Sequence, residues 1–568
     1  MPNTILSKLI GGPIRQAVRR KRDSFLASTR DCARQQRTVL TRLLRLNADT
    51  KFAQDHGLGL KLSPDEFRSR VPVSDYDYHA PYIEAVKNGD HSALLGPTNK
   101  LLMFSLTSGT TSRSKFIPIT SQFLSDYRRG WQFWGITAID QYPELSRRSF
   151  FQLTGNHDTF RTASGTPCGN ISGLVTAMQK PHVRALFSVP QVVSQIRDPD
   201  ARRYVTMRMG LQDPNVGQIL TANPATLVQL AEFANTHADR LLADIHNGTL
   251  CRAFPIEPAI FRSLRRHLKP RTRRARELAR VIDADNGVLR PRSVWPHLQF
   301  LGVWTGGSAS AYDPALNEWF GKLPRRDHGL HASEGRMTIP LRSNTSSGVL
   351  DTASHFFEFI PVAEEDAANP TVLLAHELAE GEDYFILLTT SSGLYRYHIR
   401  DVVRCTGFYN KTPELSFLHK GAHISSVTGE KISESQVVEA VLASASELGV
   451  VLKAFTLTPT WGTPVRYSLF VAGTSSPSET TRLGHLTDQR LSELNEEYAD
   501  KRGSSRLGEI ECVELAWRVW NCFREHRVGL SGATLEQYKH PCLLPDPQFE
   551  GLFEQQSGIR PREMRASA

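Results

Sequence analysis

A hydroxyl-rich segment at residues 105–115, "SLTSGTTSRSK", directly follows the apolar run "LLMF". Inward-facing backbone N–H groups, hydroxyl donors and a cation at the rim are the groups that hold a phosphate chain in proteins. The segment offers all three kinds of group, in Thr107, Ser108, Gly109, Thr110, Thr111 and Lys115. It is not a Walker A loop, because no G-K-[ST] closes it. The residues suit a phosphate-binding loop, although a Ser/Thr-rich stretch taken alone is more often a surface turn.

The elements that must position this loop are predicted from the spacing of apolar residues. We expect residues 101–115 to form a strand followed by the hydroxyl loop, and "SQFLSDYRRGWQFWGITAI" to form a helix after them. Upstream, we expect one long helix over residues 30–58, closed by Gly57, and a loop over residues 71–90. Residues 180–285 are expected to be mostly helical, because apolar residues recur there at intervals of three and four.

From residue 294 onward, short apolar runs cut by glycine indicate strands and turns. Ser433 and Gln436 have the spacing of a capping box and predict a helix start, after which strands and helices alternate. With 568 residues, the chain is too long for a single core. We therefore expect a mixed α/β fold with a large N-terminal domain (1–420), a hinge (421–426) and a small mobile α/β C-terminal domain (427–568).

Composition and charge argue against several classes of protein. No run of about 18 apolar residues exists, so no membrane span is expected, and we find no secretion signal. Seven cysteines without a C-x-x-C pair favour a reducing compartment and a cytoplasmic protein. The net charge is +10, but the basic runs at 15–22 and 265–276 alternate with apolar residues at helical spacing. They indicate solvated helix faces rather than a nucleic-acid site, and a basic surface also suits small anionic substrates. We expect a monomer.

The segment "TSGTTSRSK" resembles the phosphate loop T-S-G-T-T-G-x-P-K of the acyl-adenylate-forming superfamily, which includes the firefly-luciferase-like enzymes. Within that superfamily, the chain resembles the auxin-responsive acyl acid–amido synthetase family over residues 35–545. Further motifs follow in the family's order: "RLNADTKFAQDHG", "VPVSDYDYHAPYIEAVKNGD", "VWPHLQFLGVWTGG", "HASEG", "HFFEFIP", "GLYRYHIRDVV", "LNEEYADKR" and "LEQYKHP". Because they occur in one order along nearly the whole chain, the resemblance is specific.

This resemblance implies a ligase that uses ATP and Mg²⁺ to join a carboxylic acid to the amine of an amino acid. A carboxylate is a poor electrophile, because its charge repels nucleophiles and oxide is a very poor leaving group. Attack of the carboxylate on the α-phosphate of ATP makes an acyl-adenylate, from which an amine can displace AMP. Such a catalyst must position the polyanion and neutralise charge on phosphorus.

Two alternatives stay open from the sequence. One is an acyl-adenylating ligase with another acceptor, such as coenzyme A, and the other is a non-catalytic relative that binds nucleotide or acid. The identity of the acyl acid and of the amine cannot be read from the residues.

The resemblance also implies roles for individual residues. The loop from Thr107 to Thr111, with Lys115, would cradle the β- and γ-phosphates, while Glu334, beside Ser333, would lie near Mg²⁺ and the reacting phosphate. Asp401 would accept the ribose hydroxyls, and Thr305 and Gly306 would form a turn against the adenine or the α-phosphate. Lys539 would be the cation brought by the C-terminal domain, with Lys431 as a second candidate. Outside these motifs, each would be an ordinary surface, capping or turn residue.

The sequence departs from the superfamily pattern at Ser112, Ser114, Leu330 and Arg400. Leu330 stands where an aromatic often stacks on adenine, and Arg400 where a glycine usually precedes the ribose-binding aspartate. These changes place nucleotide affinity in question more than the class of reaction.

The helix after the loop carries Tyr127, Arg128, Arg129, Trp131 and Trp134. Two tryptophans with a cation would suit an aromatic or otherwise apolar acid. An aromatic core stripe with exposed arginines fits the same pattern at least as well.

Overall fold

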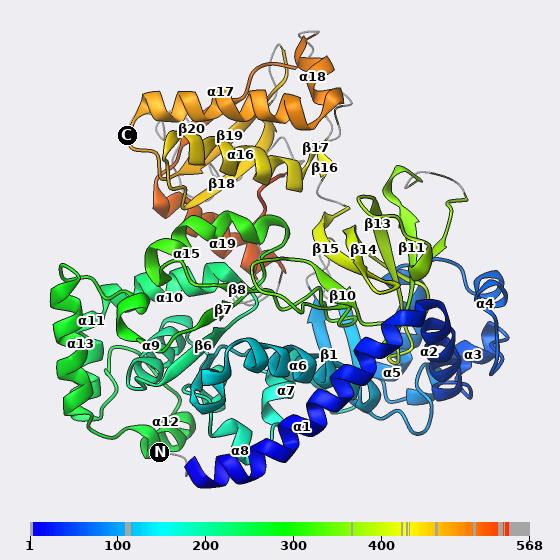
Figure 1. Ribbon diagram of the computed structural model, residues 1–568, viewed down its shortest axis with the longest axis horizontal. Coiled ribbons are helices and arrows are strands. Elements are labelled where there is room, and N and C mark those ends of the chain that lie inside the picture. The colour runs from blue at the N-terminus through cyan, green and yellow to red at the C-terminus, as the bar shows by residue number, and fades with distance from the viewer. Residues whose placement is uncertain are drawn as a thin grey trace.

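The computed structural model describes residues 4–107, 115–364, 367, 369–421, 424–425, 427, 430, 432–460, 464–503, 507–531, 538 and 540–544. Figure 1 shows a large N-terminal part, built from helices and three sheets, with a smaller C-terminal α/β part above it. The mixed α/β fold expected from the sequence is confirmed. Among the described residues, no helix has both the length and the apolar character needed to cross a bilayer.

The first sheet carries the hydroxyl-rich segment between two of its strands. β1 (Leu101–Thr107) and β2 (Lys115–Thr120) pair antiparallel with Thr107 opposite Lys115, so the segment joins two adjacent strand ends. The strand expected at the start of residues 101–115 is therefore confirmed. The sheet has the order β2-β1-β5-β4, completed by β4 (Phe160–Arg161) and β5 (Pro167–Gly169).

The expected aromatic helix follows directly as α6 (Ser121–Gln141). It begins where the Thr120 hydroxyl accepts a hydrogen bond from the N–H of Phe123, which satisfies one of the free donors of the first turn. The helix packs against the long N-terminal helix α1 (Thr4–Ser28), and Figure 1 shows α1 running across the N-terminal part.

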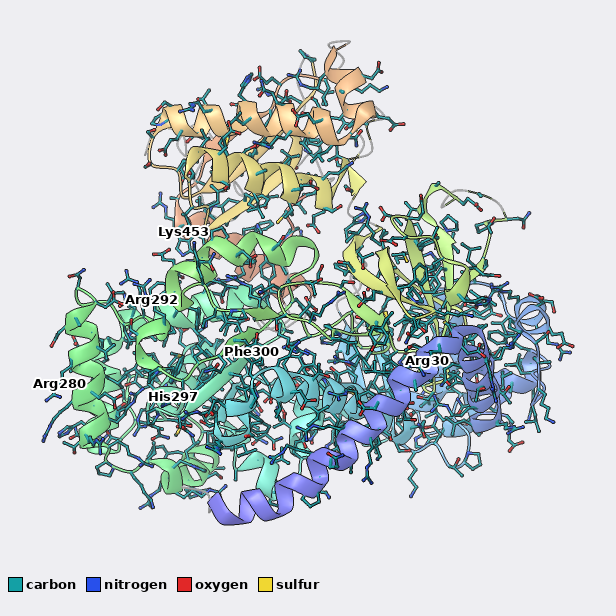
Figure 2. The ribbon with its side chains drawn as sticks, in the orientation of Figure 1. Arg30, Arg280, Arg292, His297, Phe300 and Lys453 are labelled. Carbon is teal, nitrogen blue, oxygen red and sulfur yellow. The ribbon has the colours of Figure 1, made fainter. Side chains whose placement is uncertain are left out.

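The second sheet is parallel, in the order β3-β6-β7-β8, with β3 (Ser149–Gln152), β6 (Val216–Leu220), β7 (Phe300–Gly302) and β8 (Arg325–Arg326). All residues of β6 are buried, as is usual for a parallel strand covered on both faces. Phe300 of β7, labelled in Figure 2, is also fully buried. The expectation of a mostly helical stretch at 180–285 missed β6, because a short apolar run has no period that separates strand from helix.

Helices supply the remaining mass around this sheet, and one large apolar core lies between them and the strands. They are α7 (Ile171–Ala177), α8 (Pro181–Arg184), α9 (Pro199–Leu211), α10 (Pro224–Thr236), α11 (Ala238–Asn247), α12 (Pro258–Leu264), α13 (Thr272–Ala284), α14 (Pro291–Val294) and α15 (Asp313–Phe320).

The third sheet is antiparallel, in the order β12-β11-β13-β14-β15-β10-β9. Its strands are β9 (Thr338–Ile339), β10 (Gly348–Leu350), β11 (Phe356–Pro361), β12 (Leu373–Leu374), β13 (Asp383–Thr389), β14 (Tyr397–Tyr409) and β15 (Thr412–Lys420). A second apolar core joins this sheet to α2 (Cys32–Leu46), α3 (Lys51–Asp55), α4 (Pro64–Arg70) and α5 (Tyr76–Lys87). β15 ends at Lys420, the residue before the expected hinge.

Two local expectations in this region are wrong. The chain leaves α2 at Asn47 instead of continuing as one helix over 30–58, because the Asn47 amide is tied to distant backbone. Its oxygen accepts from the Gly96 N–H (3.0 Å) and its nitrogen donates to the Ser391 carbonyl (3.2 Å). Residues 71–90 contain α5 rather than only a loop, since the Asp75 side chain caps its first turn.

The C-terminal part has its own core and two small sheets. The capping box predicted at Ser433 and Gln436 is confirmed and starts α16 (Glu434–Leu448). The other helices are α17 (Pro477–Leu494), α18 (Glu496–Gly503) and α19 (Trp517–Ser531). The strands are β16 (Ile424–Ser425), β17 (Ile432–Ser433), β18 (Ala454–Thr460), β19 (Arg466–Ala472) and β20 (Glu511–Glu514).

The two parts meet at α10. Asn223, at the start of α10, donates its side-chain N–H to the backbone carbonyl of Tyr538. Burial raises the pKa of Glu232 on the same helix, against the opposing effect of Lys453 and Arg524 from the C-terminal part. Figure 2 labels Lys453 at this junction. Tyr538 is therefore held against the N-terminal part in this arrangement.

Gly130 and Gly135 of α6 give a matched test of this packing. A Cβ at Gly130 would lie 2.4 Å from Cδ of the buried Arg336, whereas a Cβ at Gly135 would have no atom within 4 Å. Gly130→Ala should therefore lower the free energy of unfolding by about 1–3 kcal/mol through overpacking. Gly135→Ala should raise it by about 0.5–1 kcal/mol, because alanine favours the helix. Urea unfolding followed by circular dichroism would measure both, and equal shifts in one direction would contradict the packing.

Candidate active site

A cavity of about 1040 Å³ is lined by residues from all three N-terminal sheets and from the C-terminal part. Ligand sites usually have volumes of about 300–1,000 Å³, so this cavity has room for more than one small molecule. Its walls include the ends of β1 and β2, the segment 327–334, the start of β14 and residues 538 and 540–541. Pieces of chain that are far apart in the sequence thus share one cavity.

Most of the predicted site residues that the structure describes lie on this cavity. Lys115, Gly306, Ser333, Glu334 and Asp401 all line it. Thr305 directly precedes Gly306, and its backbone N–H and hydroxyl donate to Oδ2 of Asp327, at 2.6 Å and 2.8 Å.

The remaining predicted residues fall outside what the structure describes. Thr107 closes β1, but its side chain is outside the described set, as are Ser108, Gly109, Thr110, Thr111, Lys431 and Lys539. Leu106 and Lys115, which flank the loop, line the cavity, as do Tyr538 and His540, the neighbours of Lys539. Ile432, which follows Lys431, is buried in the C-terminal core.

Ser333 ties the Ser-Glu motif to the first sheet. The hydroxyl of Ser105, in the middle of β1, is buried and donates to Oγ of Ser333 at 2.9 Å. Glu334 therefore follows a residue that is fixed to the strand leading into the hydroxyl-rich loop.

The strongest electrostatic feature of the cavity is a pair of buried carboxylates beside one ammonium group. Nζ of Lys420 lies 2.6 Å from Oδ1 of Asp401, and Asp401 is only 4% exposed. Burial lowers the pKa of Lys420, but the carboxylates of Asp401 and Glu334 outweigh it and raise that pKa overall. Burial raises the pKa of Glu334, with Lys420 acting in the opposite direction. Glu334 forms no direct ion pair among the described residues, and Lys420 and Lys115 both favour its charged form.

A bulge in β14 presents Asp401 to the cavity. The pairing of β13 with β14 shifts register between Phe385 and Leu387, and Arg400 has φ +61°. This left-handed conformation costs a non-glycine residue about 1–2 kcal/mol, which explains why glycine is usual here. The backbone carbonyl of Arg400 accepts from the Gly421 N–H at 2.8 Å, while its exposed side chain lies at the cavity wall. Arg400 therefore keeps the bulge instead of abolishing it.

Asp327 holds two walls of the cavity together. Its carboxylate accepts from Thr305 and also from the Gly329 N–H at 2.7 Å, which joins the turn at 305–306 to the segment 327–334. Burial raises the pKa of Asp327 to about 6, although these hydrogen bonds favour the charged form. Sequence reasoning missed both Asp327 and Lys420. The available signals were an aspartate after a strand and a lysine directly before the hinge glycine.

Aromatic side chains form the wall beside α6. Tyr127, Trp131 and Trp134 line the cavity, and Leu330 lies on the segment across from them. The arginines of α6 are used elsewhere: Arg128 donates to the Met178 carbonyl, and Arg129 pairs with Asp126 and donates to Ser354. The guanidinium of the buried Arg336 instead lies over the Trp131 ring, 4.7 Å from its centre. The cation beside Trp131 is therefore Arg336 rather than an arginine of α6.

Comparisons with known proteins agree with the resemblance seen in the sequence. Residues 21–325 match the GH3 family N-terminal domain, residues 348–420 the central domain and residues 435–548 the C-terminal domain. The chain is 25% identical over 559 residues to a jasmonoyl–L-amino acid synthetase, GH3.5, of Oryza sativa subsp. japonica, covering 91% of this chain and 93% of the relative. It is 24% identical over 543 residues to an indole-3-acetic acid-amido synthetase, GH3.3, of Arabidopsis thaliana, covering 91% and 90%.

A solved structure of the GH3.15 acyl acid amido synthetase has the same fold. It superposes with a TM-score of 0.80 at 20% identity and covers 93% of this chain and 94% of the other. The same protein in complex with 2,4-DB gives a TM-score of 0.82 at 19% identity, covering 95% and 96%.

The buried Glu334 carboxyl makes the site testable by pH. Its pKa is raised in the folded chain, so the contribution of this group to stability is fully present below the unfolded pKa of about 4.3 and is lost as pH rises through the folded pKa. Glu334→Gln cannot ionise, so it should stabilise the chain relative to the parent at pH 8 and less at pH 5. Urea unfolding at both pH values would measure the difference.

An exposed carboxylate serves as the control for this measurement. Glu493→Gln changes the same charge on the surface of α17 and should give no pH-dependent difference of this kind. The buried placement of Glu334 would be contradicted if the difference in the free energy of unfolding between Glu334→Gln and the parent were constant with pH or larger at pH 5.

Proposed function

The chain belongs to the GH3 family, and we propose that its cavity joins a carboxylic acid to an amino acid through an acyl-adenylate made from ATP. The observation that carries this proposal is the gathering of Lys115, Ser333, Glu334 and Asp401 on one cavity. Tyr538 and His540, from late in the chain, line the same cavity. A cavity that brings cations, hydroxyls and a carboxylate without a direct ion pair together suits nucleotide chemistry.

The reaction proceeds in two balanced steps. A carboxylate oxygen of the acid forms a bond to the α-phosphorus of ATP, and the bond to the bridging oxygen breaks, so that pyrophosphate leaves. The nitrogen of the amino acid then forms the C–N bond, the C–O bond to AMP breaks, and the amine gives up a proton. The products are the amide, AMP and pyrophosphate.

Asp401 and the turn at 305–306 would hold the nucleoside. A carboxylate accepts two O–H donors well, so Asp401, paired with Lys420, would take the ribose hydroxyls. Thr305 is fixed by Asp327, and Gly306 beside it lets a ring or phosphate approach closely. Leu330 offers the base an apolar surface without aromatic stacking.

The hydroxyl-rich loop would hold the phosphates. The loop from Thr107 to Thr111 joins two strand ends that open onto the cavity, and Lys115 places a cation there. Backbone N–H groups and hydroxyls of such a loop would bind the β- and γ-phosphates. Ser333, anchored by Ser105, would add a hydroxyl near the same groups.

The residues also suit Mg²⁺. No group of three His, Cys, Asp or Glu side chains that could hold a metal occurs among the described residues. Mg²⁺ keeps several waters and takes one or two carboxylates plus substrate phosphates, so a single Glu334 fits it. When bound, the ion neutralises charge on the phosphates. Glu334, buried without an ion pair, would orient it.

Lys539 would supply the mobile cation. Its neighbours Tyr538 and His540 line the cavity, and Asn223 holds the Tyr538 carbonyl. In this arrangement Lys539 would neutralise charge on the α-phosphate during adenylation. A swing about residues 421–426 would then remove the segment and open the cavity to the amino acid. We keep Lys431 as the second candidate for this role.

The names of the relatives do not identify the acid or the amino acid that this chain would use. Their names differ in the acid, jasmonoyl in one and indole-3-acetic acid in another. The cavity therefore has to be tested with a panel of carboxylic acids.

Carboxylate-dependent exchange of pyrophosphate into ATP is the assay that tests the function. Some acids of the panel should support exchange, and addition of amino acids should then release AMP and an amide. Turnover only with coenzyme A would favour a thioester-forming ligase, and no exchange with any acid would favour a non-catalytic relative. Each outcome separates the candidates without knowledge of the natural acid.

Lys539→Ala tests whether Lys539 acts in adenylation rather than in amide formation. It should slow adenylation by roughly 100- to 1000-fold, the usual effect of removing one contact to transition-state charge. Amide formation from a preformed acyl-adenylate should fall much less, and single-turnover kinetics would separate the two. Lys431→Ala is the matched variant: a larger loss of adenylation in Lys431→Ala than in Lys539→Ala would reverse the assignment.

A further inference from the structure

Beyond the proposed nucleotide site, the cavity also extends along the parallel sheet, and we call this part the second lobe. Alternate residues of the parallel sheet face this lobe, as the two-residue period of a strand requires. Phe150 and Gln152 of β3 and Gln218 and Leu220 of β6 all line the cavity, while Ile219 belongs to the core on the other face of the sheet. The lobe therefore lies on one face of the sheet, where α6 and α7 also contribute to its walls.

Gln218 is the chemical anomaly of this lobe. It lies in the middle of a strand whose residues are all buried, it is 5% exposed, and it faces the cavity. Its amide oxygen is buried and has no hydrogen-bond partner among the described residues. An unpaired buried polar group costs about 1–3 kcal/mol. A ligand that offers an O–H or N–H donor at this point would remove that cost.

The far end of the lobe is formed by α1. Ile14, Arg15 and Val18 line the cavity there. The helix is fixed to the end of α6, because Arg19 and Arg22 both pair with Asp140, at 2.8 Å and 2.6 Å. The match to the GH3 family N-terminal domain begins at residue 21, so Ile14, Arg15 and Val18 precede the matched residues.

We infer, resting on the proposed function, that the acid is an extended amphipathic carboxylic acid with an O–H or N–H donor along its length. Gln218 accepts this donor, and the distal end of the acid lies against Ile14 and Val18 of α1. A short acid leaves most of the lobe empty and the Gln218 oxygen unpaired. An entirely apolar acid fills the lobe but leaves the same oxygen without a partner.

Decanoic acid and its monohydroxylated isomers provide the probes. Trp131 and Trp134 line the cavity, so tryptophan fluorescence reports binding of an acid without ATP, and pyrophosphate exchange reports adenylation. At least one hydroxylated isomer should bind about tenfold or more tightly than decanoic acid, because a site built around a hydrogen bond disfavours the analogue that lacks it. Gln218→Met should reduce this ratio to near one and leave the affinity for decanoic acid unchanged or improved.

Matched variants separate a specific contact from a structural effect. Gln152→Met changes an amide on the same face of the neighbouring strand and should keep the hydroxyl preference. Val18→Trp should weaken binding of ten-carbon acids but not of butyric acid, whereas Ala17→Trp, on an exposed position of α1 outside the cavity wall, should change neither. Equal losses for decanoic and hydroxydecanoic acids in Gln218→Met would assign Gln218 a structural role and overturn the inference.

The two readouts keep this inference distinct from the proposed function. Selective binding without pyrophosphate exchange would support the inference and contradict the synthetase function. Exchange with acids that shows no preference for any hydroxylated isomer would support the function and overturn the inference.

Discussion

The buried carboxylates of Asp401 and Glu334 share the ammonium group of Lys420, and Lys115 also acts on Glu334. A carboxylate that is buried without a direct partner is costly where water is excluded. Lys420 pairs directly with Asp401 at 2.6 Å, whereas Glu334 forms no direct ion pair among the described residues. Glu334 is therefore the carboxyl of this pair that favours a proton or a further cation.

The surrounding elements serve to hold this charge arrangement in place. Asp401 and Lys420 are direct cross-strand partners of β14 and β15, so the sheet itself fixes their separation. The bulge at Arg400 turns the end of β14 toward the cavity at the expense of a left-handed backbone. Glu334 is placed from the opposite direction, through the bond between Ser105 and Ser333. No single element contains the site, which explains why it needs three sheets to assemble.

Because the site depends on strand pairing, only some of its residues could be predicted from the sequence. Glu334 and Asp401 were identifiable because each lies in a short motif with its own residue pattern. Lys420 was not, because its role exists only through the register of β14 against β15, nineteen residues apart in the chain. The same limit explains the errors in the fold: β6 has no distinguishing period, and the break after α2 depends on the contacts of Asn47 with Gly96 and Ser391.

The two halves of the cavity are lined by different kinds of residue. For this reason the class of reaction could be predicted from the sequence, whereas the acid could not. The half that we propose for the nucleotide is defined by charges and hydroxyls, which are rare in a protein interior and therefore stand out in a sequence. The second lobe is walled by residues such as Phe150, Leu220 and Ile139, which look in sequence like any other core residue. Whether such a residue faces a neighbour or an empty space depends on the opposite layer, here α6 and α1. Gln218 is the exception, since a polar side chain in a buried parallel strand is unusual enough to indicate a pocket once its surroundings are known.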